Sequence, residues 1–157
     1  MKTRGLILAA LHLILTLSVA GKFLYDRQTL PRVWVKAAPF DPSLPIRGRY
    51  VRIRVDATPG TGWTSGGGMS GVTLRVAGGQ LLADRKDGAE TIGIYQGFSV
   101  RLTAPLAYFI PATVADPSRR APDEELWAEI TVPPSGAIRP IRLGVKKNGT
   151  LTPLPLN

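Results

Sequence analysis

The chain lacks cysteine altogether and has a single histidine, His12. Without cysteine it can form no disulfide, thiolate nucleophile, iron–sulfur cluster or thiolate zinc site. Because His12 lies inside an apolar segment, the rest of the chain offers no imidazole to a Ser–His–Asp triad or a His-ligated metal. We therefore assign no catalytic residue, no metal ligand and no cofactor, and we prefer a non-enzymatic role while leaving catalysis open.

Charge is also missing from residues 5–21, an apolar run that Lys2 and Arg4 precede and Lys22 follows. As a helix this run is about 26 Å long, close to the ~30 Å hydrocarbon core of a bilayer. Lys22 can extend its ammonium group to the headgroups, so the next apolar residues can belong to the span. The basic N-terminus favours insertion with that end in the cytoplasm. We predict that residues 1–25 form a single-pass transmembrane anchor.

The same segment has a second interpretation. Ser18, Val19 and Ala20 offer the small side chains that a signal peptidase prefers. A signal peptide would then be cleaved after Ala20, which would leave a soluble protein. Either interpretation exports the remaining residues across the membrane, so the sequence leaves retention and cleavage open.

Long helices are not expected after this segment. The chain contains 14 prolines and 17 glycines, spread throughout, which is typical of short strands with many turns. We predict a linker at 26–31 and one exported domain at 32–157, mainly β, folded as an antiparallel sandwich or barrel. Pro122 followed by three acidic residues predicts one short helical insertion in this domain.

Alternation of apolar and polar residues predicts the strands. The clearest lies at 50–56, where Val51, Ile53 and Val55 share one face. The Gly-rich stretch 58–71 predicts a flexible loop. Further strands are expected at 32–36, 72–77, 91–95, 98–103, 108–110, 126–132 and 137–145, with turns at Gly78-Gly79, Asp87-Gly88, Gly97 and Asn148-Gly149.

The net charge of the chain is +9, and +7 remains on the exported part once Lys2 and Arg4 are set aside. A basic domain beside a bilayer is attracted to anionic headgroups, so the lipid bilayer is one expected partner. Nucleic acid is not an expected partner, because the arginines are dispersed, no helix carries a basic stripe, and the domain is exported.

Arginines gather in one place, at residues 47–54, on and just before the clearest strand. Four guanidinium groups so close repel one another unless anions meet them. One interpretation is cross-strand pairing with the acidic residues at 84–90 or 123–129. The other is a contact surface for lipid phosphate or an acidic partner.

Two segments resemble one protein family. Residues 40–51 read FDPSLPIRGRYV and are similar to the D-P-x-x-L-x-R-G-D-Y-V signature of the GDYXXLXY family, and residues 108–111, YFIP, resemble its second block. The order of membrane helix, linker and β-rich domain agrees as well. The resemblance implies a bacterial inner-membrane protein of unknown function, with its C-terminal domain in the periplasm or outside, often working alongside a multi-pass membrane partner.

The chain departs from that signature at charged positions. Arg49 stands where the family has Asp, and Ala112 stands where the second block continues with Glu. By motif position we predict a binding surface formed by Arg47, Arg49, Tyr50, Arg52, Arg54, Tyr108, Phe109 and Pro111.

We interpret the chain as a membrane-anchored accessory domain that docks on a membrane-protein partner, and two alternatives stay open. One is an envelope hydrolase with a Ser–Lys dyad, the only nucleophile–base pair that the composition allows. Its candidates are Ser43, Ser65 and Ser70 with Lys36 or Lys86. The other is a soluble periplasmic binding module released after Ala20.

Overall fold

The computed structural model describes residues 2–40, 50–64, 68–111, 116–117, 119–134 and 137–155, and it divides into two units, Met1–Leu30 and Pro31–Asn157. The first unit is the helix α1 (Lys2–Thr29). Its stretch Gly5–Thr29 is long and apolar enough to cross a membrane. A signal sequence near the N-terminus can have the same length and composition. Retention as an anchor therefore stays a prediction.

The helix is longer than the sequence suggested. We expected a linker at 26–31, but α1 continues to Thr29. The amide of Leu30 still donates to the carbonyl of Asp26, and Pro31 follows directly. No proline or glycine lies between residue 22 and Pro31, so the helix ends only where the proline removes a donor and restricts the residue before it.

The second unit is built from strands. They are β1 (Arg32–Pro39), β2 (Tyr50–Pro59), β3 (Gly68–Ala77), β4 (Gln80–Arg85), β5 (Ile92–Tyr95), β6 (Val100–Leu102), β7 (Leu106–Phe109), β8 (Glu124–Thr131), β9 (Arg139–Lys147) and β10 (Thr150–Pro153). The domain is mainly β, as the sequence predicted.

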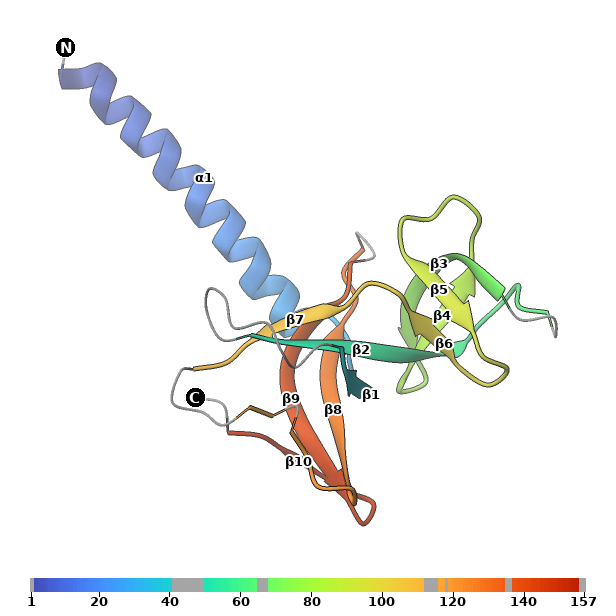
Figure 1. Ribbon diagram of the computed structural model, residues 1–157. Coiled ribbons are helices and arrows are strands. Elements are labelled where there is room, and N and C mark those ends of the chain that lie inside the picture. Colours follow the sequence, from blue (N-terminus) through green and yellow to red (C-terminus); the bar gives the residue numbers. More distant parts are fainter. Residues whose placement is uncertain are drawn as a thin grey trace. The chain divides into compact units, whose positions relative to one another are not determined.

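Five of these strands close into a barrel, in the order β2–β4–β3–β5–β6 and back to β2. Every pairing in the barrel is antiparallel except the one between β2 and β4, where Thr58 lies beside Leu82. The other half of β2 leaves the barrel and pairs with β1 on one side and β7 on the other. From β1 the sheet continues through β8 and β9 to β10 (Figure 1). Of the two architectures that we predicted, an antiparallel sandwich or barrel, the structure shows the barrel.

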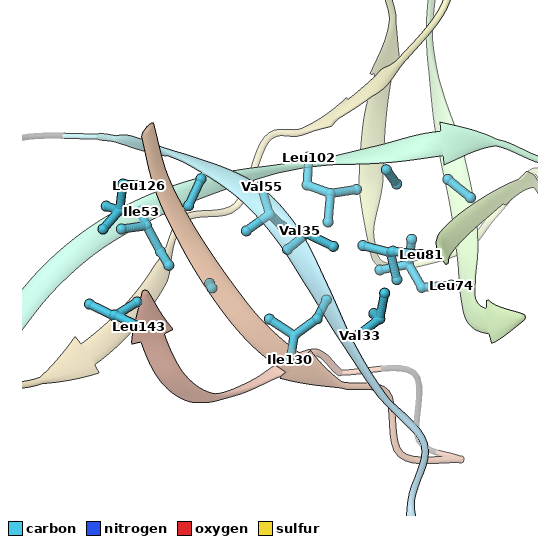
Figure 2. Close-up of a cluster of buried hydrophobic side chains, with 14 of the residues drawn as sticks. Val33, Val35, Ile53, Val55, Leu74, Leu81, Leu102, Leu126, Ile130 and Leu143 are labelled. Atoms are coloured by element: carbon cyan, nitrogen blue, oxygen red, sulfur yellow. The ribbon is translucent and has the colours of Figure 1, made fainter. Parts of the chain in front are cut away.

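One hydrophobic core joins the barrel to the sheet. Val51, Ile53 and Val55 on β2 are buried, as their alternation predicted. Figure 2 shows Leu74 and Leu81 of the barrel in the same cluster as residues from the sheet strands β1, β8 and β9. Because β2 contributes to both parts, the strands that the structure describes fold around a single core.

The prediction of a short helical insertion at Pro122 is wrong. Among the residues that the structure describes, α1 is the only helix, and β8 begins at Glu124. Glu124 and Glu125 lie opposite Lys147 and Lys146 in the β8–β9 ladder. The acidic residues that suggested a helix N-terminus instead pair with cations on other strands, and pairing with a neighbouring strand outweighs a weak local preference.

The hairpin turns are confirmed. Gly78 and Gly79, and likewise Asn148 and Gly149, have positive φ at both central positions, as a two-residue type I′ hairpin requires. The Gly-rich stretch differs from its prediction, because β2 continues to Pro59 and β3 begins at Gly68.

Candidate contact surface

The predicted contact residues centre on the outer face of β2. Tyr50, Arg52 and Arg54 alternate with the buried residues of that strand and are partly exposed. On one flank β7 places Phe109 directly opposite Tyr50. On the other flank β1 places Ala38 opposite Arg54. The side chains of three strands therefore meet on one face of the sheet.

Aromatic rings hold the two arginines of this face. The rings of Tyr50 and Phe109 meet edge to face, with 6.0 Å between centroids and an angle of 62°. The guanidinium of Arg52 lies 5.6 Å from the centroid of the Tyr50 ring. The guanidinium of Arg54 lies 4.3 Å from the centroid of the Phe40 ring. Such cation–π contacts orient a guanidinium and leave its donor edge available.

Phe40 completes the surface although sequence analysis did not assign it. Its amide donates to the carbonyl of Arg52 over 2.9 Å, which continues the β1–β2 pairing past the end of β1. We call this set the arginine–aromatic surface. It consists of Phe40, Tyr50, Arg52, Arg54 and Phe109. Phe109 is the most open of the five, with 73% of its surface exposed.

The acids that could have neutralised these arginines do not contact them, and most of these acids pair with other cations. In the described part of the chain, no carboxylate lies within ion-pair distance of Arg52 or Arg54. The ion pairs of the acidic segments, among the described residues, are Asp84–Arg75, Asp87–Arg85, Asp123–Lys147, Glu124–Lys147, Glu124–Arg120, Glu125–Lys36 and Glu129–Arg142. The proposed cross-strand pairing with residues 84–90 or 123–129 is therefore not observed for these two arginines.

The remaining predicted contact residues are placed differently. Arg47 and Arg49 lie outside the described residues. Tyr108 is opposite the buried Val51 and packs against the core, so it does not belong to the arginine–aromatic surface. Pro111 is exposed, two residues beyond the end of β7. Four of the eight predicted residues, Tyr50, Arg52, Arg54 and Phe109, are thus brought together.

A second cluster of cations and rings covers the outer face of β1, β8 and β9. The Lys146 amine lies 4.7 Å from the centroid of the Trp127 ring, and the Arg142 guanidinium lies 5.4 Å from that of Trp34. This cluster contains its own acids. Arg142 donates to the buried carboxylate of Glu129, with Nε 2.6 Å from Oε2.

The second acid of that cluster is Glu125. Hydrogen bonds from Lys36 and from the Trp127 indole lower the pKa of the Glu125 carboxyl. Each cation next to a ring here has an acid close by, which distinguishes this face from the arginine–aromatic surface. We interpret it as structural.

The first part of the Gly-rich stretch, residues 60–64, contacts the barrel strands. Asp84 accepts hydrogen bonds from the amide of Thr61, 2.7 Å away, and from Nε of Arg75, also 2.7 Å away. Both bonds lower the pKa of the Asp84 carboxyl, and the bond from Arg75 has the larger effect. The Trp63 ring stacks on Tyr95 at 5.3 Å, and its indole donates to the carbonyl of Ala83. Thr61 and Trp63, in the stretch predicted as a flexible loop, therefore make specific contacts with barrel strands.

Two residues of the hydrolase alternative, Ser70 and Lys36, have acidic partners. Ser70 donates to the carboxylate of Asp87 over 3.4 Å, and the amine of Lys36 is bonded to Glu125. Ser43 and Ser65 lie outside the described residues. No group of three or more His, Cys, Asp or Glu side chains that could hold a metal occurs among the residues that the structure describes.

One open cavity lies beside β3. Its volume is about 520 Å³, and its lining includes Met69, Ser70, Arg85, Asp87 and Ile92. The two charged residues of this lining pair with each other over 3.6 Å. The cavity therefore presents no unpaired charge to a ligand.

Comparison with protein-family models, with curated proteins and with solved structures finds no match to this chain.

Proposed function

We propose that the chain is a membrane-anchored accessory protein whose β domain docks on an acidic segment of an integral membrane protein. The observation that carries the proposal is the pair Arg52 and Arg54, which are oriented by aromatic rings and have no carboxylate partner in the described part of the chain. Carboxylates of a partner would complete both guanidinium groups.

The spacing of the two arginines suits an extended acidic segment. Residues two apart on a strand lie about 6.6–7 Å apart and point to the same side. Acidic residues at alternate positions of an extended segment in the partner would be separated by the same distance, so each could meet one arginine. Phe109 and Tyr50 next to them add aromatic area, and aromatic and arginine side chains are the types enriched at protein interfaces.

The membrane part of the proposal rests on α1 and on the residues before it. Gly5–Thr29 is long and apolar enough to span a bilayer, and Lys2 and Arg4 favour a cytoplasmic N-terminus. Only Leu30 and Pro31 separate α1 from β1 in the sequence. An anchored chain therefore keeps its basic domain beside the extracytoplasmic face. The resemblance to the GDYXXLXY family adds the expectation of a bacterial inner membrane and of a multi-pass partner.

Charge reversal tests the docking surface. The variant R52E/R54E, expressed as a tagged full-length chain, is expected to lose at least 10-fold in co-purification of its membrane-protein partner. The matched control is K86E/R119E, which makes the same change in net charge at exposed sites outside the surface and should retain the partner. Equal recovery with both variants would contradict the proposal.

A lipid-binding role predicts a different result in the same experiment. If R52E/R54E kept its protein partner but lost affinity for vesicles containing anionic lipid, the surface would serve headgroups rather than a protein. Partner loss without a change in vesicle binding is the result that our proposal expects.

The cavity beside β3 favours the alternative of a released binding module, because Met69 and Ser70 in its lining belong to the Gly-rich stretch. That alternative requires cleavage after Ala20. Mass spectrometry of the mature N-terminus separates the two, because a chain that begins at Met1 or Lys2 excludes release and one that begins at Gly21 excludes anchoring.

A further inference from the structure

One polar side chain inside the apolar run of α1 has no hydrogen-bond partner in the part of the chain that the structure describes. Residues 5–21 contain three polar side chains, His12, Thr16 and Ser18. The Thr16 hydroxyl donates to the carbonyl of His12, and the Ser18 hydroxyl donates to the carbonyl of Ile14. The imidazole of His12 makes no hydrogen bond within the described residues. His12 lies near the middle of the run, where an ionisable group without a partner is costly in hydrocarbon.

Small side chains share the helix face of His12. At 100° per residue, Gly5, Ala9, Thr16 and Ala20 all lie within about 80° of one another around α1, with His12 at the edge of the same arc. The opposite side is mixed, with the larger residues Ile7, Leu11 and Ile14 next to Ala10, Ser18 and Gly21, whereas the arc with His12 at its edge carries no large aliphatic residue of the run. Small residues four apart allow a second helix backbone to approach closely, as transmembrane helix pairs require.

We infer that α1 pairs in the membrane with α1 of a second copy of this chain, through the face formed by Gly5, Ala9, His12, Thr16 and Ala20. We call it the His12 face. The inference rests on the proposed function, because it requires that the helix is retained as an anchor.

The chemistry of the imidazole favours a second copy as the occupant. A neutral imidazole has one N–H donor and one nitrogen acceptor. Two copies insert with the same orientation, so both His12 rings lie at the same depth. Each ring then offers the group that the other lacks, and no second kind of polar residue is needed. A helix of an unrelated protein would have to carry its own polar group at that depth.

The absence of cysteine makes a direct test possible. Single-cysteine variants of the full-length chain, oxidised in native membranes, report which helix faces meet. Ala9→Cys and Thr16→Cys lie on the His12 face, and Leu11→Cys and Ser18→Cys are controls at similar depths on the opposite side. We expect several-fold more disulfide-linked dimer from positions 9 and 16 than from 11 and 18.

Substitution of His12 tests the role of its ring. In the Ala9→Cys background, His12→Leu is expected to weaken pairing about 3-fold to 10-fold, the range for one hydrogen bond between membrane helices. His12→Asn keeps a donor and an acceptor and should retain the dimer. Ser18→Leu on the opposite side should leave it unchanged.

Two failures have different meanings. Equal dimer yields at positions 9, 11, 16 and 18, or disulfides from the His12 face to another protein alone, would overturn the pairing and leave the anchored accessory role standing if the N-terminus is intact. A mature N-terminus at Gly21 would overturn both.

Discussion

Arg52 and Arg54 differ from other strand arginines of the domain in what lies beside them. Arg75, Arg101 and Arg142 each have Nε within 3.1 Å of a carboxylate oxygen. The two arginines of β2 contact aromatic rings instead. An arginine that is already paired with a carboxylate gains little from binding a further anion. An arginine that is oriented by an aromatic ring can still donate its N–H groups to an anion. This contrast supports the choice of contact surface.

At the residue scale, Asp84 should make the stability of the domain depend on acid pH. Its lowered pKa means that its bonds to Arg75 and Thr61 stabilise the fold above the ordinary pKa near 4 and are lost as pH falls below it. Asp84→Asn should cost about 1–2 kcal/mol at pH 7, and the difference from the wild type should shrink below pH 4. Thermal unfolding of both proteins at several pH values measures this.

The control for this prediction is Asp87→Asn. The Asp87 side chain is 86% exposed, and its pair with Arg85 is long, at 3.6 Å. Its loss should change stability by less than about 0.5 kcal/mol. A variant at Asp84 that is no less stable than the variant at Asp87, or a difference from the wild type that does not shrink as the pH falls below 4, would contradict the stabilising role of the bonds from Arg75 and Thr61 to Asp84.

The contact residues on the outer face of β2 could be predicted from the sequence, but those on the neighbouring segments could not. Alternation along residues 50–56 placed Tyr50, Arg52 and Arg54 on one side, and the structure agrees. The same reasoning could not distinguish Tyr108 from Phe109, because only the register with β2 shows that Tyr108 faces the core. Phe40 was missed because its position depends on a backbone bond to Arg52, which no local pattern encodes.

At the scale of elements, β2 connects the two parts of the domain. Its first half lies between β1 and β7, and its second half lies between β4 and β6. The arginine–aromatic surface is on the first half, while the second half closes the barrel. A change that loosens the barrel would therefore also affect the strand that carries the contact residues.

Gly93 tests the closed barrel. A Cβ atom at this position of β5 would lie 2.5 Å from Cγ1 of Val100 and 3.1 Å from Cγ1 of Val72, both of which are buried. Gly93→Ala should destabilise the domain by about 1–3 kcal/mol, because an added methyl group overpacks the interior. Chemical denaturation monitored by tryptophan fluorescence measures the change. Gln96→Ala, at an exposed position of the same hairpin, is the control, and equal stability of the two variants would show that β5 is not packed as described.

Element types were predicted better than element boundaries. The turns at Gly78-Gly79 and Asn148-Gly149 have a local cause in positive φ, and both were found from the sequence. Strand β4 was missed although Leu81 and Ala83 alternate as a strand should, because it lies between the turn signals at Gly78-Gly79 and Asp87-Gly88. The helix expected near Pro122 failed because pairing across β8 and β9 is long-range.

At the scale of the whole molecule, the chain combines one apolar helix with one basic domain that has its own core. The sequence identified both parts and the break near residue 30. The closure of five strands into a barrel could be predicted only as one of two options, because sandwich and barrel share the same strand pattern and differ in non-local pairing. The resemblance to the GDYXXLXY family stays a prediction.

The most direct test of the central claim is photo-crosslinking in intact membranes, followed by mass spectrometry of the full-length chain. Benzoylphenylalanine replaces Phe109 on the arginine–aromatic surface, and in a matched variant it replaces Phe98, which is 89% exposed elsewhere on the domain. We predict an uncut N-terminus and crosslinks from position 109, not from 98, to an acidic extracytoplasmic segment of one integral membrane protein. An N-terminus at Gly21, or the same crosslinks from both positions, would contradict the account.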